Sequence, residues 1–272
     1  MKKEIKYSLI FILVVLTISW VLTLVIFSKP ETIQLFPLIM FVPAIVGITL
    51  NSIRYMSIRL VFSPITTRIN IKSILFSLLY PILFIGFIAI VVSLTGVAKF
   101  NAGKLSDLTN FPSIEIIIFG FLLMFGEEYG WRGFLLKELA AVKGKILSAM
   151  VVGIVWALWH GPAIYGLANH TNMENPLMIS VIQMGAVFVF SIPFAYSYFL
   201  TNNIFPPMLF HFVWNFYNPM VLGNIYQNQP GIIEGNMIYI NGEGLAGIIL
   251  GLLFIIWYIY KFKKDPIKNV GG

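Results

Sequence analysis

The sequence predicts an all-α, multi-pass membrane protein with about eight transmembrane helices around a polar cavity. Of its 272 residues, 58% are hydrophobic and only 11% are charged, and the mean hydropathy is +0.88. Soluble domains carry about 25% charged residues, so this composition is that of a membrane protein. The apolar runs are continuous and apolar all round, whereas the strands of a membrane barrel would alternate at every second residue.

Eight apolar stretches of roughly 17–28 residues match the length that a helix needs to cross about 30 Å of hydrocarbon. The first follows three lysines and is too long for the apolar core of a signal peptide, about 7–15 residues, so we expect a retained helix. The seventh is the weakest because Asn and His residues dilute it. The approximate limits are 6–28, 34–52, 72–98, 113–140, 146–167, 176–200, 203–222 and 244–261.

Basic residues are distributed unevenly between the two sides of this predicted topology. With the N-terminus in the cytoplasm, 15 of the 18 Lys and Arg residues, Lys268 among them, fall on the cytoplasmic side; the other three are Lys29, Lys99 and Lys104. The positive-inside rule then places both termini in the cytoplasm. Basic residues facing an anionic leaflet account for the net charge of +7, so we expect a lipid bilayer and no nucleic acid as partner.

The connecting segments and the residue composition predict the domain organisation and exclude some chemistries. Segment 53–71 is basic and partly apolar, which is typical of an interfacial helix or a solvated linker, and 223–243 is a polar loop rich in Gly and Asn. No internal repeat divides the chain, so residues 1–272 are expected to form one membrane domain. The absence of Cys excludes disulfides, thiolate metal ligands and a cysteine nucleophile.

Three charged residues lie inside the fourth apolar stretch. Each charge at membrane depth costs roughly 2.5–3.5 kcal/mol on insertion scales, so it needs a partner or a function. Glu128 and Arg132 are four residues apart and share a helix face, which predicts an ion pair. Glu127 is turned about 100° away and needs a water or a partner from another helix. His160 is the best candidate for that partner.

Two further stretches bring polar groups to a similar depth. His160 follows Trp156 by one helical turn, and His211, Asn215 and Asn218 form a polar stripe on an aromatic helix. A single intramembrane His is as often a structural hydrogen bonder as a functional group. Three such placements at one depth predict a site, because a carboxylate, two imidazoles and an amide can activate water and stabilise an oxyanion.

Two chemistries fit these residues. In the first, Glu127 and His160 hold a water, take its proton and direct it at a peptide carbonyl, while His211 and Asn215 donate to the oxyanion. In the second, His160, His211 and Glu127 ligate a divalent metal such as zinc, which lowers the pKa of bound water. The chain lacks the HExxH motif, and no cofactor is certain. His170 lies in a polar outer loop, and neither Ser180 nor Ser191 lies in a nucleophile motif.

The three motifs together resemble the CAAX prenyl protease and bacteriocin-processing (CPBP) family, which includes the type II CAAX prenyl endopeptidases. Glu127-Glu128-Tyr-Gly-Trp-Arg132 matches the EExxxR motif, Trp156-Ala-Leu-Trp-His160 resembles the second motif, and His211-Phe-Val-Trp-Asn215 matches HxxxN. The resemblance covers residues 113–222. It implies an intramembrane endopeptidase in which Glu127 and His160 activate water, His211 and Asn215 form the oxyanion site, and Glu128 and Arg132 support the geometry.

The substrate that the resemblance implies is a membrane-associated peptide or lipidated protein. In the eukaryotic branch of the family it is a prenylated CAAX peptide cleaved on the cytoplasmic side, whereas prokaryotic relatives are linked to bacteriocin maturation or immunity. The basic face carries no eukaryotic targeting signal, which favours a prokaryotic plasma membrane over the endoplasmic reticulum. Two other functions stay open: a non-enzymatic immunity or scaffold protein that uses the same cavity, and a proton-coupled transporter.

Overall fold

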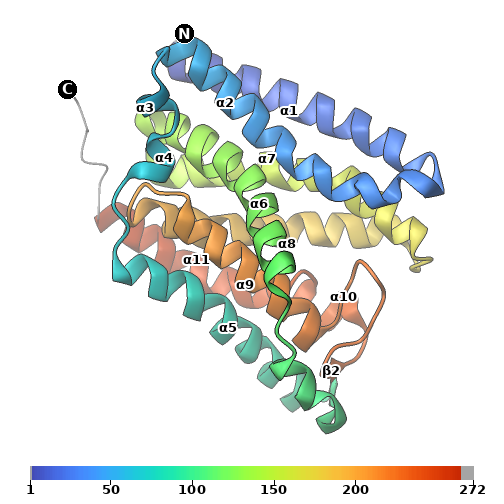
Figure 1. The fold of residues 1–272 in the computed structure, drawn as a ribbon. Helices are drawn as coiled ribbons and strands as arrows, with labels where there is room; N and C mark the ends of the chain where they lie inside the picture. Colours follow the sequence, from blue (N-terminus) through green and yellow to red (C-terminus); the bar gives the residue numbers. More distant parts are fainter. Residues whose placement is uncertain (1, 265–272) are drawn as a thin grey trace.

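The computed structural model describes residues 2–264 of the chain as an all-α protein (Figure 1). Two two-residue strands, β1 (Lys99–Phe100) and β2 (Ile233–Glu234), pair antiparallel. Lys268 lies outside the described residues. The helices are α1 (Lys3–Phe27), η1 (Pro30–Phe41), α2 (Val42–Tyr55), α3 (Ile58–Val61), α4 (Ser63–Thr66), α5 (Ile71–Leu94), η2 (Ala102–Thr109), α6 (Ile114–Glu128), η3 (Tyr129–Leu136), α7 (Lys137–His170), α8 (Pro176–Phe199), α9 (Phe205–Leu222), α10 (Met237–Ile240) and α11 (Leu245–Lys264).

Six helical runs within residues 2–264 are long and apolar enough to cross a membrane, which confirms a multi-pass membrane protein but does not show the predicted eight spans. The predicted fourth and fifth spans lie in one continuous run, Ile114–His170, and α9 is not among the six. The six runs are Lys3–Phe27, Pro30–Tyr55, Ile71–Leu94, Ile114–His170, Pro176–Phe199 and Met237–Lys264.

The difference in count has a physical reason. The run Ile114–His170 has 57 residues, and a straight helix of that length would measure about 85 Å, far more than one bilayer crossing. Gly144 interrupts it with a φ of 76°, a left-handed conformation that suits glycine, and the chain changes direction there. In α9, His211 and the two Asn residues lower the hydropathy below that of a typical span, as the sequence indicated.

The helices form a bundle in which α7 and α8 occupy the middle (Figure 1). Helix α1 packs beside α2 and against α7, and α9 lies between α8 and α5. Helix α6 crosses the bundle in front of α8 and α9 in the view of Figure 1. Segment 53–71 forms two one-turn helices, α3 and α4, in place of a single interfacial helix.

One end of the bundle, which we call the basic end, collects most of the cationic residues. Arg54 at the end of α2 forms ion pairs with Glu4 in α1 and with Glu138 at the start of α7. Lys137 donates to the hydroxyl of Ser63 in α4, at 3.1 Å. These contacts hold the first turn of α1 and the last turn of α2 beside the start of α7.

The opposite end, which we call the far end, is formed by η2, the paired strands, the 223–236 loop and α10 (Figure 1). Lys104 in η2 donates to the carbonyl of Pro230 at 2.9 Å and forms an ion pair with Glu234 at 3.3 Å. Asn241 donates to the carbonyl of Leu222 at 3.3 Å and so ties the end of α9 to α10. The far end is therefore an ordered cap made of loops and short elements.

Candidate active site

The site begins where α6 changes into η3, a π-helical segment whose eight residues are all buried. Single π-helical turns inside α-helices are frequent at functional sites. Gly130 allows η3 to lie directly on the backbone of Pro43 in α2, because a Cβ atom at this position would overlap Pro43. The close approach of α2 and the burial of η3 fix the direction of Glu127 and Glu128, which precede η3, and of Arg132 within it.

The predicted ion pair between Glu128 and Arg132 is present. Arg132 Nη1 donates to Glu128 Oε1 at 2.9 Å, and both side chains are 0% exposed. The guanidinium also lies over the rings of Trp156 at 4.2 Å and Phe194 at 4.6 Å. Cation–π contacts in a desolvated setting are worth about 2 kcal/mol, so they offset part of the cost of burying Arg132.

Glu128 has a second partner that connects it to α9. His211 Nδ1 lies 2.9 Å from the same oxygen, Glu128 Oε1. A carboxylate oxygen accepts, so Nδ1 carries the proton of this bond, and Nε2 is the free nitrogen of a neutral imidazole. The ring of His211 packs edge-on against Trp156 and Phe194. Glu128 therefore fixes the ring orientation of His211.

Glu127 receives its partner from α7, as expected of a buried carboxylate, but this partner is Trp156 and not His160. Trp156 Nε1 donates to Glu127 Oε2 at 2.8 Å. The backbone carbonyl of Trp156 accepts from His160 Nδ1 at 2.9 Å, so Nε2 of His160 is the free nitrogen of the neutral ring. Trp156 thus orients both residues that were predicted to activate water.

A cavity of about 300 Å³ brings the predicted site residues together. Glu127, His160, His211 and Asn215 all line it, although they come from three different helices. Glu128 and Arg132 are not among its lining residues and lie behind the wall. The amide of Asn215 has only a long contact, 3.8 Å to the sulfur of Met124.

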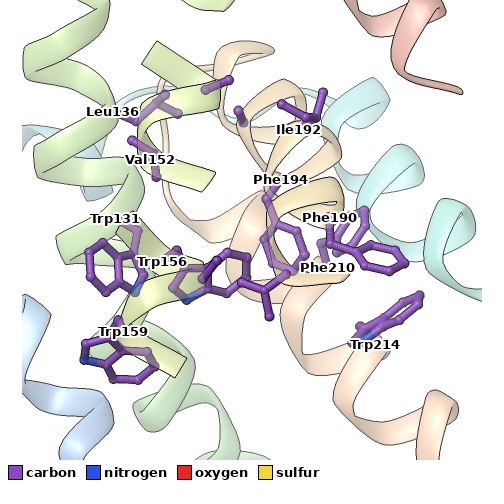
Figure 2. Packing of buried hydrophobic residues seen from close by; sticks show 14 of the residues in the cluster. Trp131, Leu136, Val152, Trp156, Trp159, Phe190, Ile192, Phe194, Phe210 and Trp214 are labelled. Carbon is purple, nitrogen blue, oxygen red and sulfur yellow. The ribbon is translucent and has the colours of Figure 1, made fainter. Parts of the chain in front are cut away.

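Most of the remaining wall is apolar. Figure 2 shows the aromatic side chains of α7, α8 and α9 gathered in this region, with Trp156 beside Phe194 and Trp214 near Phe190. Phe190 and Trp214 are in contact with ring centroids 4.1 Å apart. A few polar groups on an apolar concave wall are typical of a ligand site.

The other candidates lie elsewhere. Among the described residues, no three His, Asp or Glu side chains form a group that could hold a metal ion. His170 lines a second cavity at the far end of α7. Ser180 donates to the carbonyl of Gly161 at 2.8 Å, and Ser191 lies 3.5 Å from the carbonyl of Ala149, so both hydroxyls bond to helix backbone.

The sequence reading missed a second carboxylate, the partly exposed Glu243, which also lines the cavity. It accepts from Trp214 Nε1 at 3.1 Å, from the Tyr226 hydroxyl at 3.0 Å and from the side-chain amide of Gln183. Burial, followed by the Glu243 carboxylate, raises the pKa of the Tyr226 hydroxyl well above its usual range. Tyr226 therefore stays protonated and able to donate.

Only one sign of this cluster was visible in the sequence, a lone acidic residue at the end of a Gly- and Asn-rich loop. Such a residue is ordinarily fully solvated, and the partial burial of Glu243 follows from the folding of the 223–236 loop over α8 and α9. Tyr226 comes from that loop and Gln183 from α8, and no spacing in the sequence relates either of them to Glu243.

A known protein family matches the part of the chain that carries these residues. The profile of the family described as type II CAAX prenyl endopeptidase Rce1-like matches residues 109–217. That segment includes α6, η3, α7 and α8 and most of α9, and hence Glu127, His160, His211 and Asn215. No curated protein matches the chain. The chain therefore contains an Rce1-like domain of the type II CAAX prenyl endopeptidase (CPBP) family, which implies a CAAX-type intramembrane protease.

Proposed function

We propose that the protein is an intramembrane endopeptidase in which Glu127 and His160 activate the water that attacks a peptide bond of a membrane-associated substrate. The observation that carries the proposal is the shared cavity, which is lined by one carboxylate, two imidazoles and one amide from three helices. Each imidazole donates its Nδ1 proton to a fixed acceptor, so the free Nε2 nitrogens are defined.

The chemical steps follow from these placements. Glu127 takes a proton from water while the water oxygen forms a bond to the peptide carbonyl carbon, and His160 Nε2 accepts a hydrogen bond that orients the water. The carbonyl oxygen becomes negatively charged. When the C–N bond breaks, the proton held by Glu127 passes to the leaving amine, so the carboxylate is regenerated and no cofactor is consumed.

His211 and Asn215 stabilise the oxyanion in this proposal. Asn215 supplies an amide N–H from a side chain with no strong partner among the described residues. A donor role for His211 requires a proton on Nε2 in addition to the one on Nδ1. Glu128, 2.9 Å from Nδ1, balances the positive charge of that imidazolium. Preorganised donors of this kind are worth about 2.7–4 kcal/mol each in other hydrolases.

The substrate class follows from the apolar wall and from the family. A mostly apolar cavity with polar groups at one level suits a peptide that carries an apolar anchor, including a prenylated CAAX-type peptide. Trp156 and Arg132 are positioning residues in this scheme, because they hold Glu127 and Glu128 in place.

Peptide cleavage by purified Glu127→Gln tests the proposal, with a fluorogenic prenylated CAAX peptide as probe. We expect cleavage to fall by at least about 10³-fold, because the general base is lost while the shape is kept. Glu115→Gln is the matched control, since Glu115 is an exposed carboxylate in the first turn of the same helix. Full cleavage by a folded Glu127→Gln variant would overturn the role of Glu127 as general base. Absence of cleavage by the folded wild-type protein would instead favour a scaffold or immunity role.

A further inference from the structure

The cavity extends from the level of Glu127 toward the far end, and Asn215, in the middle of α9, is an exposed residue of its wall. Along α7, its lining runs from Trp156 through His160 to Leu167, close to the last turn of the helix at His170. The other contributors nearest the exit are Tyr226 in the 223–236 loop and Glu243 just before α11. Leu167, Tyr226 and Glu243 are partly exposed, so this end of the cavity is not closed by packing.

The basic end of the site is closed. Trp131, Arg132 and Phe134 in η3 are 0% exposed, and so is Phe210, which precedes His211 in α9. Tyr129 donates to the carbonyl of Val61 in α3 at 2.6 Å, which ties η3 to the basic end. No residue of the cavity wall lies on the basic side of this layer among the described residues.

A second cavity also lies toward the far end of the bundle. It has a volume of about 440 Å³ and lies between the end of α1, the start of η1 and the end of α7. Thr23 lines both cavities, so the two are adjacent. The outer cavity reaches Ser28 and His170, where these helices end at the far end. Both hollow regions therefore lie on the side opposite the basic residues.

The distribution of charge indicates which end of the bundle lies on which side of the membrane. The basic end carries Arg54, Lys72, Lys137 and Lys264, whereas the far end carries Lys29, Lys99 and Lys104. The positive-inside rule assigns the basic end to the cytoplasm. The open end of the cavity then faces the extracytoplasmic side.

We propose that this chain takes its substrate from the extracytoplasmic side of the membrane, so that its substrates are exported or membrane-anchored peptides whose cleavage site lies at the outer surface. This inference rests on the proposed function for the act of cleavage, but the side of access stands on cavity geometry and charge. The closed layer of η3 blocks a direct path along the bundle axis from the basic end to Glu127.

Single-cysteine labelling tests the side of access without any need for activity. The chain has no Cys, so each introduced thiol is unique. Ala163→Cys is a conservative change at a buried position in the cavity wall. Ser106→Cys in η2 reports the far end and Ala141→Cys near the start of α7 reports the basic end, both at exposed positions. The probe is a membrane-impermeant, cationic methanethiosulfonate applied to intact cells and to inside-out vesicles.

We expect Ser106→Cys and Ala163→Cys to react in intact cells, and Ala141→Cys to react only in inside-out vesicles. If Ala163→Cys reacts only from the side that labels Ala141→Cys, the cavity opens to the basic end and the inference is wrong. If Ser106→Cys is silent in intact cells, the orientation is wrong. If Ala163→Cys reacts from neither side while Leu167→Cys, nearer the exit, is also silent, water does not enter and the inference fails.

A peptide-cleavage assay in oriented vesicles distinguishes failure of this inference from failure of the proposed function. An impermeant peptide with one apolar anchor is added to sealed right-side-out or inside-out vesicles, with Glu127→Gln as the inactive control. Cleavage only in right-side-out vesicles is expected. Cleavage only in inside-out vesicles overturns the inference while supporting the peptidase. Outer-side labelling without cleavage in either vesicle type supports the side of access and contradicts the peptidase.

Discussion

The indole nitrogen of Trp156 donates to the carboxylate of Glu127 across 2.8 Å, and the ring of the same tryptophan lies under the guanidinium of Arg132. One side chain of α7 therefore holds both acidic residues of the EExxxR motif, Glu127 directly and Glu128 through its ion pair. The second motif therefore contributes its tryptophan as well as its histidine to the wall of the cavity.

Trp156→Phe should lower peptide cleavage by about 10- to 100-fold, because it removes a hydrogen bond to a charged group worth roughly 1.5–3 kcal/mol and keeps an aromatic ring beside Arg132. Trp159→Phe is the matched control. Trp159 also lines the cavity, but its indole nitrogen has no hydrogen-bond partner among the described residues. Equal losses in the two variants would show that ring size matters and the hydrogen bond does not.

Arg132→Ala should destabilise the folded protein in detergent by about 3–5 kcal/mol, because Glu128 would be left as a buried charge without its cation. The loss is measured as a shift in thermal unfolding. Arg59→Ala, at an exposed position in α3, removes the same side chain and should leave the unfolding temperature nearly unchanged. A folded Arg132→Ala variant of wild-type stability would mean that His211 alone neutralises Glu128.

Chelators should leave cleavage unchanged if the proposed mechanism holds, because in it Glu127 and His160 activate the water without a metal ion. The measurement compares rates with and without excess chelator after prolonged dialysis, and a zinc-dependent peptidase of HExxH type serves as the positive control. Loss of activity that added zinc restores would assign His160, His211 and Glu127 the alternative role of metal ligands.

The sequence was sufficient for what depends on composition and local spacing. The membrane class followed from the low charge, and the Glu128–Arg132 pair followed from its four-residue separation on a helix. The convergence of three motifs on one cavity was predicted from their similar depth. The partner of Glu127 was not predicted, because the choice between Trp156 and His160 depends on how α6 rotates against α7.

Other features could not be read from the sequence because they depend on tertiary packing. The number of spans differed for two reasons. The predicted fourth and fifth spans form one helical run that only the kink at Gly144 divides, and the polar stripe lowers the hydropathy of α9. The π-helical turn η3 has no local signature apart from its glycines, and Glu243 is partly buried only because a loop folds over it. Hydropathy reports on single segments, whereas these features arise between segments.

Gly130→Ala should disturb the site more than its small size suggests, because the added methyl group would overlap the backbone of Pro43. Overpacking of this kind costs about 1–3 kcal/mol and would shift η3, with Arg132, away from α2. Gly86→Ala is the matched control, since a Cβ at this position in α5 meets nothing within 4 Å. That control should keep or raise stability, by up to about 1 kcal/mol, because Ala favours the helix.

Glu243→Gln tests whether the second carboxylate positions the active site. The carboxylate accepts from Trp214, which lies on α9 between His211 and Asn215, and from Tyr226, whose raised pKa keeps its proton in place. A glutamine has one accepting oxygen, so one of the donors loses its partner, and an unsatisfied buried group costs about 1–3 kcal/mol. We expect kcat to fall by roughly 10-fold with KM nearly unchanged. The position of α9, and with it His211 and Asn215, would shift, whereas the apolar wall of the cavity would be kept.

Two comparisons make the result of Glu243→Gln interpretable. Glu234→Gln changes a partly exposed carboxylate of the same far end and should leave kcat unaltered. Tyr226→Phe removes one donor to Glu243 without adding a polar group, so it should lower kcat less than Glu243→Gln does. If Glu243→Gln instead raises KM alone, the carboxylate contacts the substrate directly, and its role is recognition at the open end of the cavity.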